Sequence, residues 1–163
     1  MSLTFTQEDK QELAGIRAHY PDGRAATLPA LHFAQRKFGY VSSEVIDLVA
    51  AELALSRSHV LNVATFYTMY NKKPVGKYHI QICTNISCSL LGARRLVEHL
   101  SGLLGIQPGE TTEDGMFTLT EVECLGSCGT APMMQVNDTF FENLTEARLD
   151  ELFQSMKKGE IDV

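Results

Sequence analysis

The fold is decided by the stretch Tyr78-His79-Ile80-Gln81-Ile82-Cys83-Thr84-Asn85-Ile86-Ser87-Cys88. Its first half alternates apolar with polar side chains, which is typical of a half-buried strand. From residue 90 the apolar side chains recur at helical spacing, so we expect a long amphipathic helix with Cys88 at its start. The apolar face of that helix would carry Leu90, Ala93, Leu96, Val97, Leu100 and Leu104.

The chain beyond this helix predicts the rest of a small mixed sheet. Residues 116–123 predict a second strand, and residues 133–136 and 139–142 predict a hairpin that turns at Asn137-Asp138. A last helix is expected near the end of the chain, because an acidic first turn and a basic last turn flank an apolar face. That face carries Leu149, Leu152, Phe153 and Met156. The order strand–helix–strand–hairpin–helix resembles a thioredoxin-like fold reduced to four strands.

Upstream, residues 1–70 show helical spacing and predict four short helices that pack as a small bundle. The first would carry Leu13, Ile16 and Tyr20 on its apolar face and end at Pro21-Asp22-Gly23. The second is expected from about Arg24 to Phe38, where Pro29 either bends the helix or marks its true start. The expected caps of the first, third and fourth helices are Thr6, Ser42 or Ser43, and Ser56.

A polar, basic segment that contains Pro74 and Gly76 separates the helical part from the alternating part. We therefore expect an α/β protein with two domains, a helical domain over residues 1–72 and a sheet-containing domain over residues 73–163. The same segment contains Lys72, Lys73 and Lys77, which are the one dense group of basic residues in the sequence. We interpret the segment as a solvated linker.

Composition narrows the class of protein. The formal net charge of −6 argues against a nucleic-acid-binding surface, which needs clustered Lys and Arg. No apolar run approaches the ~20 residues that cross a bilayer, so no direct membrane insertion is expected. The first residues lack the basic and apolar regions of a signal peptide, which predicts a cytosolic protein.

All four cysteines fall between residues 83 and 128, in the patterns C-x4-C and C-x3-C. In a reducing compartment, grouped cysteines are metal ligands or redox groups more often than disulfides. We therefore interpret Cys83, Cys88, Cys124 and Cys128 as the ligands of one metal centre. If the two predicted strands are neighbours, both cysteine loops leave the sheet at the same end.

Two metals remain open from spacing alone, a [2Fe–2S] cluster and a structural zinc ion held by four cysteines. The long separation of the two pairs favours the cluster, because zinc modules bind in compact loops. The domain also has enough apolar residues to fold without a metal. Thioredoxin-type disulfide exchange lacks support because the chain has no C-x-x-C motif.

A cluster with four thiolates carries a charge of about −2 when oxidised and −3 when reduced, so it needs partial positive charge around it. We expect Gly126 and Gly129 to let backbone N–H groups approach the sulfurs, and the helix after Cys88 to direct its positive end at them. The chain has no G-x-G-x-x-G motif and no P-loop, so a nucleotide site of either kind lacks support.

Several other residues have a structural and a functional interpretation. The five histidines His19, His32, His59, His79 and His99 are interpreted as surface or helix-face residues. The aromatic run Phe66, Tyr67 and Tyr70, with Met69, fits core packing or burial against a partner subunit. Glu123 is either surface charge or a group that keeps the potential of the centre low.

Three runs of the sequence resemble a known family. They are Cys83-Thr84-Asn85-Ile86-Ser87-Cys88, Glu123–Asn137 with Cys124 and Cys128, and Val63-Ala64-Thr65-Phe66-Tyr67-Thr68-Met69-Tyr70. Together with Pro29-Ala30-Leu31-His32 and Phe38-Gly39-Tyr40, they are similar to the E subunit of bacterial NADH–quinone oxidoreductase, respiratory complex I.

The resemblance implies a helical domain followed by a thioredoxin-like [2Fe–2S] ferredoxin domain, with one cluster on the four cysteines. It implies a non-catalytic electron-transfer subunit, with FMN and NAD bound only by a partner flavin subunit. It also implies a peripheral position on the cytoplasmic face of the inner membrane, through the complex. NAD-dependent formate dehydrogenases and NAD-reducing hydrogenases contain similar subunits and stay open as hosts.

Overall fold

A computed structural model describes residues 3–161 of the chain. The chain divides into two compact units, Met1–Pro74 and Val75–Val163. This division lies two residues after the boundary expected at residue 72. That each unit folds as a domain of its own stays a prediction.

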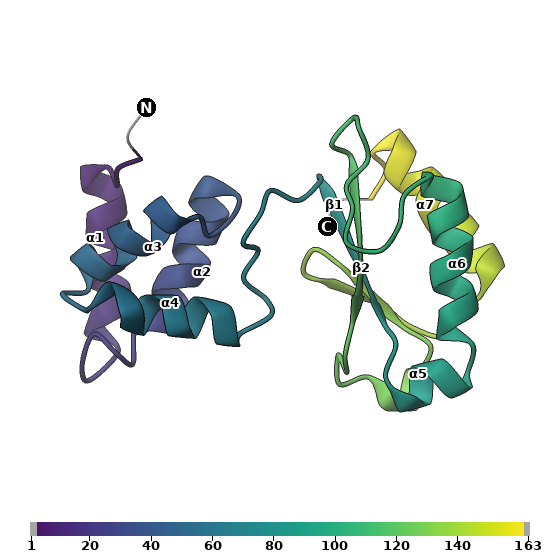
Figure 1. Ribbon diagram of the computed structural model, residues 1–163, viewed down its shortest axis with the longest axis horizontal. Coiled ribbons are helices and arrows are strands. Elements are labelled where there is room, and N and C mark those ends of the chain that lie inside the picture. The colour runs from purple at the N-terminus through teal and green to yellow at the C-terminus, as the bar shows by residue number, and fades with distance from the viewer. Residues whose placement is uncertain (1–2, 162–163) are drawn as a thin grey trace. The chain divides into compact units, whose positions relative to one another are not determined.

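Within residues 3–74 the first unit contains four helices (Figure 1), and their buried apolar side chains make one core. The helices are α1 (Gln7–Ala18), α2 (Thr27–Phe38), α3 (Ser43–Glu52) and α4 (Arg57–Phe66). The side chains of Thr6, Ser42 and Ser56 accept hydrogen bonds from the first turns of α1, α3 and α4, which confirms these three caps. The packing of the four helices as a bundle stays a prediction.

Two expectations for this unit were wrong. Helix α2 begins at Thr27 and not near Arg24, and Pro29 lies in its first turn. Proline is tolerated there because the first N–H groups of a helix have no partner within the helix. Tyr20 lies beyond the end of α1 and is 40% exposed, so it does not belong to the apolar face of that helix.

The aromatic run at the end of α4 divides between core and surface. Tyr70 is only 1% exposed, and its hydroxyl donates to the carbonyl oxygen of Leu28 at 2.9 Å. Gln35 holds the same segment, because its side chain donates to the carbonyl oxygen of Met69 at 3.0 Å. Phe66, in contrast, is 78% exposed and packs edge-on against Tyr67. Core packing therefore accounts for Tyr70 and not for Phe66.

The second unit contains a four-stranded sheet in the order β2-β1-β3-β4. Its strands are β1 (Tyr78–Cys83), β2 (Phe117–Val122), β3 (Met134–Val136) and β4 (Thr139–Phe141). Strands β1 and β2 are parallel, whereas β3 is antiparallel to both β1 and β4. The residues between β3 and β4 are Asn137 and Asp138, and Asn137 has a φ of 53°, which confirms the expected hairpin turn.

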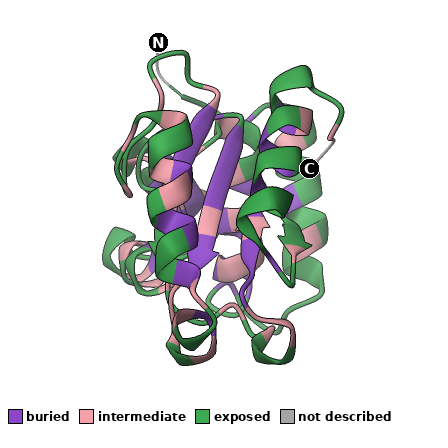
Figure 2. Ribbon diagram, turned by 90° about the vertical axis from the view of Figure 1, so that its right-hand side faces the viewer, coloured by how far each residue is buried: buried purple, intermediate pink, exposed green. Residues whose placement is uncertain are grey.

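Two long helices cover one face of this sheet, α6 (Ala93–Leu104) and α7 (Glu146–Lys158) (Figure 1). Figure 2 shows the buried strands behind these helices, whose outer surfaces are exposed. The Phe117 ring lies between Tyr78 and Phe153, with a ring-centre distance of 5.4 Å to each. None of the helices within residues 3–161 has both the length and the apolar character needed to span a bilayer.

The expected long helix after Cys83 is two helices, so this prediction was wrong. A short helix α5 (Ile86–Leu90) contains Cys88, and α6 begins only at Ala93. Gly92 separates them with a φ of 97°, a conformation that glycine adopts at little cost. Cys88 lies in the first turn of α5 and not of the long helix, and Leu90 is 83% exposed.

His79 is not a surface residue, contrary to expectation. It lies in β1, between β2 and β3, and is 9% exposed. Its Nε2 atom is 2.9 Å from the hydroxyl oxygen of Thr120, and burial lowers the pKa of the imidazole. The alternation in β1 therefore reflects a central strand with both faces largely covered.

Candidate metal centre

The parallel pairing of β1 with β2 brings the two cysteine loops to one end of the sheet. Cys83, the last residue of β1, pairs with Val122, the last residue of β2. Cys124 follows two residues later, and the N–H of Thr84 donates to the Val122 carbonyl oxygen at 2.9 Å. The carboxyl ends of adjacent parallel strands share one edge, so the expectation that both loops leave at the same end is confirmed.

The first loop carries a buried cysteine pair. Cys83 and Cys88 are 3% and 2% exposed. The side chain of Asn85 caps α5, and the hydroxyl of Ser89 donates to the Thr84 carbonyl oxygen at 2.7 Å, so the turn between the two cysteines is closed from both ends. Burial and a hydrogen bond with Cys83 raise the pKa of the Cys88 thiol to about 11, against a backbone hydrogen bond from Met133 that lowers it.

The second loop carries an exposed pair, Cys124 and Cys128, whose sulfur atoms lie 3.4 Å apart. Gly126 has a φ of 86°, and its N–H donates to the sulfur of Cys124 at 3.4 Å. This backbone hydrogen bond lowers the pKa of the Cys124 thiol, because it stabilises the thiolate. Gly126 therefore has the role expected of it.

No contact of the Gly129 backbone with a sulfur corresponds to that of Gly126, and the role expected of Gly129 stays a prediction. Its φ is outside the left-handed region, and nothing lies within 4 Å of a Cβ atom built on it. It forms part of a single turn of 3-10 helix, η1 (Cys128–Thr130).

Two side-chain hydrogen bonds join the loops, and sequence reasoning missed both. The amide of Asn85 donates to Oε2 of Glu123 at 2.9 Å. A hydrogen bond with Cys124 and the charge of Cys124 raise the pKa of the Cys128 thiol, and a weaker hydrogen bond from the Ser87 side chain opposes this. The Asn85 side chain also caps α5, and no spacing in the chain indicated that it contacts Glu123.

The cysteine arrangement fits a binuclear cluster in its donor set. Each loop offers one pair of free thiols at the same end of the sheet. A tetrahedral metal with bonds of ~2.3 Å holds two sulfurs ~3.8 Å apart, and the Cys124–Cys128 separation of 3.4 Å is close to that. Within residues 3–161, no three His, Cys, Asp or Glu side chains are grouped closely enough to hold one metal ion.

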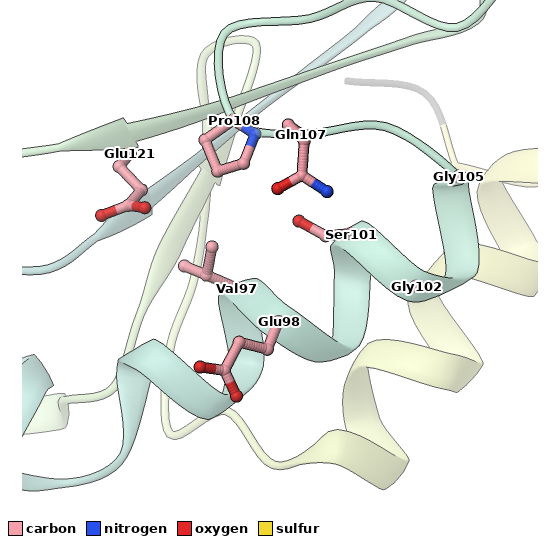
Figure 3. A pocket seen from close by; sticks show the side chains of 8 residues that line it. All are labelled: Val97, Glu98, Ser101, Gly102, Gly105, Gln107, Pro108 and Glu121. Carbon is pink, nitrogen blue, oxygen red and sulfur yellow. The ribbon is translucent and has the colours of Figure 1, made fainter.

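A separate hollow lies between α6, the loop that follows it and β2 (Figure 3). Val97 and Ser101 of α6 point toward Gln107 and Pro108 of the loop, and Glu121 of β2 lies at one end. None of the four cysteines lines the hollow. It is therefore a surface feature distinct from the cysteine loops.

Comparison with known proteins assigns the family. Residues 13–157 match the family model of the thioredoxin-like [2Fe–2S] ferredoxins. The chain belongs to this family. The family matches across both units of the chain, and the expected thioredoxin-like ferredoxin fold is confirmed.

The family includes proteins close to this chain in sequence. One E subunit of the NADH-quinone oxidoreductase of Rhizobium meliloti, numbered E 2, is 46% identical over 93% of this chain and 90% of its own length. NADH-quinone oxidoreductase subunit 2 of Thermus thermophilus is 44% identical over 93% and 86%. The resemblance to the E subunits of this oxidoreductase is thereby confirmed, and the chain is a member of their family.

A solved structure gives a more distant match. The NAD+-reducing [NiFe]-hydrogenase in its air-oxidized state aligns with a TM-score of 0.69 over 80% of this chain and 23% of that chain. At 22% identity this match supports the fold alone.

Proposed function

We propose that this ferredoxin is a non-catalytic electron-transfer subunit of an NADH–quinone oxidoreductase. Cys83, Cys88, Cys124 and Cys128 hold one [2Fe–2S] cluster. The chain docks beside a partner subunit that binds FMN and NADH, and the complex keeps it at the cytoplasmic face of the inner membrane. The cluster, when bound, supplies one-electron transfer.

The observation that carries the proposal is the meeting of two cysteine pairs at one end of parallel strands. A [2Fe–2S] cluster takes two thiolates for each iron, and the chain offers one pair from each loop. Backbone N–H groups of Gly126 and Met133 donate toward Cys124 and Cys88. These donors provide partial positive charge beside sulfur without a counter-ion.

The spectrum of the full chain tests the cluster against the zinc alternative. Protein purified without air should be reddish brown, contain two irons per chain, and give a paramagnetic resonance signal after one-electron reduction. A colourless chain with one zinc ion and no iron would instead support a zinc-stabilised interaction domain.

The host complex has a second candidate. A similar role in an NAD-reducing hydrogenase or an NAD-dependent formate dehydrogenase is the alternative, and the shared fold is compatible with the first of these hosts. Purification of the chain from its own cells separates these hosts, because the co-purifying redox subunits differ between them.

Exposed aliphatic side chains beside the first loop support docking of the flavin subunit. Ile86, Leu90 and Leu91 are 73%, 83% and 59% exposed, on or just after the helix that carries Cys88. Exposed apolar residues that gather beside a redox site are typical of an interface. An electron carrier also needs its partner close to its ligands, which supports an interface on this side of the second unit.

Replacing Leu90 by Gln should weaken binding to the flavin subunit about tenfold, because burial of one leucine contributes roughly 1.5–3 kcal/mol. The absorption spectrum should not change, since Leu90 lies outside the core of the second unit. Titration of the flavin subunit with each variant measures the effect. Leu103→Gln, on α6, is the matched control. Equal affinities for Leu90→Gln and the parent would contradict this placement of the interface.

The charge of Glu123 should lower the midpoint potential of the centre, because adding an electron beside a carboxylate is unfavourable. Glu123→Gln keeps an oxygen that can accept from Asn85 and removes the charge. The potential should rise by roughly 50 mV. A redox titration followed by paramagnetic resonance measures the midpoint potential. Glu113→Gln is the control, because Glu113 lies in the loop before the first residue of β2, whereas Glu123 follows its last residue. An unchanged potential would show that Glu123 is only surface charge.

A further inference from the structure

The two cysteine pairs are held in different ways. Cys83 and Cys88 are enclosed by the core of the second unit. Cys124 and Cys128 are exposed, on a loop whose regular structure is the single turn η1. An exposed loop of this kind opens readily unless side chains hold it. What holds this loop therefore bears on how long a cluster stays bound.

Glu142, the residue after β4, contacts this loop on both sides of Cys128. Its Oε1 atom accepts hydrogen bonds from the hydroxyls of Ser127 and Thr130, the latter at 2.5 Å. The two hydroxyl oxygens are themselves 2.7 Å apart, so the three side chains lie in one compact group. Both hydroxyls lower the pKa of the Glu142 carboxyl, in keeping with an ionised acceptor.

The backbone beside Glu142 extends the same contact. The N–H of Asn143 donates to the carbonyl oxygen of Thr130 at 2.8 Å, and the N–H of Leu144 donates to that of Pro132 at 2.9 Å. Leu144 is 4% exposed and belongs to the core. The segment that carries Glu142 is thus fixed to the core, whereas Cys128 is not.

We propose that Glu142 is the positioning residue of the exposed cysteine pair, acting through Ser127 and Thr130 to hold the turn that presents the Cys128 sulfur. The inference rests on the proposed cluster and goes beyond it. It assigns to one carboxylate the task of keeping Cys124 and Cys128, two of the four ligands, in place. Glu142 does not touch the metal. It ties the exposed loop to the rigid part of the domain, and without it the turn opens and exposes the centre.

Four loaded variants test this role by the rate at which a chelator removes iron, followed by the loss of visible absorption. Glu142→Ala should lose its cluster at least about tenfold faster than the parent, because charge-assisted hydrogen bonds are lost. Glu142→Gln keeps an acceptor oxygen and should be within about threefold of the parent. Ser127→Ala/Thr130→Val should match Glu142→Ala. The triple variant, Glu142→Ala/Ser127→Ala/Thr130→Val, should lose its cluster no faster than the double variant Ser127→Ala/Thr130→Val, since the three residues act as one unit.

Glu113→Ala is the matched control, an exposed carboxylate in the loop before Phe117, the end of β2 opposite to the one that leads to Cys124, and should lose iron at the parental rate. A parental rate in Glu142→Ala, or a triple variant much faster than the double, would overturn the inference. So would equal acceleration in Glu142→Gln and Glu142→Ala, since rescue by the acceptor oxygen separates positioning from charge. A parent that binds zinc and no iron would instead refute the proposed function, and the inference with it.

Discussion

Cys128→Ser is expected to remove the [2Fe–2S] absorption and the paramagnetic resonance signal while leaving the fold intact. The Cys128 side chain is exposed and belongs to no core cluster, so its replacement costs little stability. A serine hydroxyl is a poor substitute for a thiolate, because iron–sulfur clusters are held by soft thiolate ligands. Iron content, the visible spectrum and far-ultraviolet circular dichroism of the purified chain measure both halves of this expectation.

The buried pair provides the contrast. Cys88→Ser should also lose the cluster, but it places a hydroxyl where the side chain is 2% exposed and should lower stability by about 1–2 kcal/mol as well. The two variants thus separate ligation from packing. Retention of a parental spectrum and two irons per chain in all four single Cys→Ser variants would refute the ligand assignment.

Gly76→Ala is expected to destabilise the second unit by about 3 kcal/mol, at the upper end of the overpacking range. A Cβ atom at residue 76 would lie 2.8 Å from the backbone of Phe117 and 2.9 Å from that of Met116. Backbone atoms cannot rotate away as a flexible side chain can. A shift would also break the hydrogen bond from the Gly76 N–H to the Thr118 hydroxyl at 2.7 Å, where β1 enters the sheet.

The measurement is the midpoint of urea unfolding of the full chain, compared with a second glycine variant. Gly102 lies within α6, and nothing lies within 4 Å of a Cβ atom built there. Gly102→Ala should therefore stabilise the chain by roughly 0.5–1 kcal/mol, since alanine favours a helix. If Gly76→Ala destabilises the chain and Gly102→Ala stabilises it, the loss at residue 76 comes from the close backbone contact and not from alanine as such. Equal midpoints for Gly76→Ala and the parent would show that the sheet relaxes around the added carbon.

Much of the architecture could be predicted because its signals are local. Thr6, Ser42 and Ser56 precede helices that they cap, and Asn137-Asp138 turns the hairpin. Helix boundaries were less predictable. The apolar pattern continued across Gly92, but its left-handed backbone ends one helix before the next begins. Periodicity reports which side chains are apolar, not where a chain changes direction.

For the cysteine site, the sequence by itself determined the ligand candidates, their pairing as C-x4-C and C-x3-C, and the resemblance that led to the family. Only the tertiary structure decided that one pair is buried and the other exposed, that Asn85 contacts Glu123, and that Glu142 accepts a hydrogen bond from Thr130 beside Cys128. The physical reason is the strand order β2-β1-β3-β4. It joins residues far apart in the chain, and side-chain spacing carries information only about near neighbours.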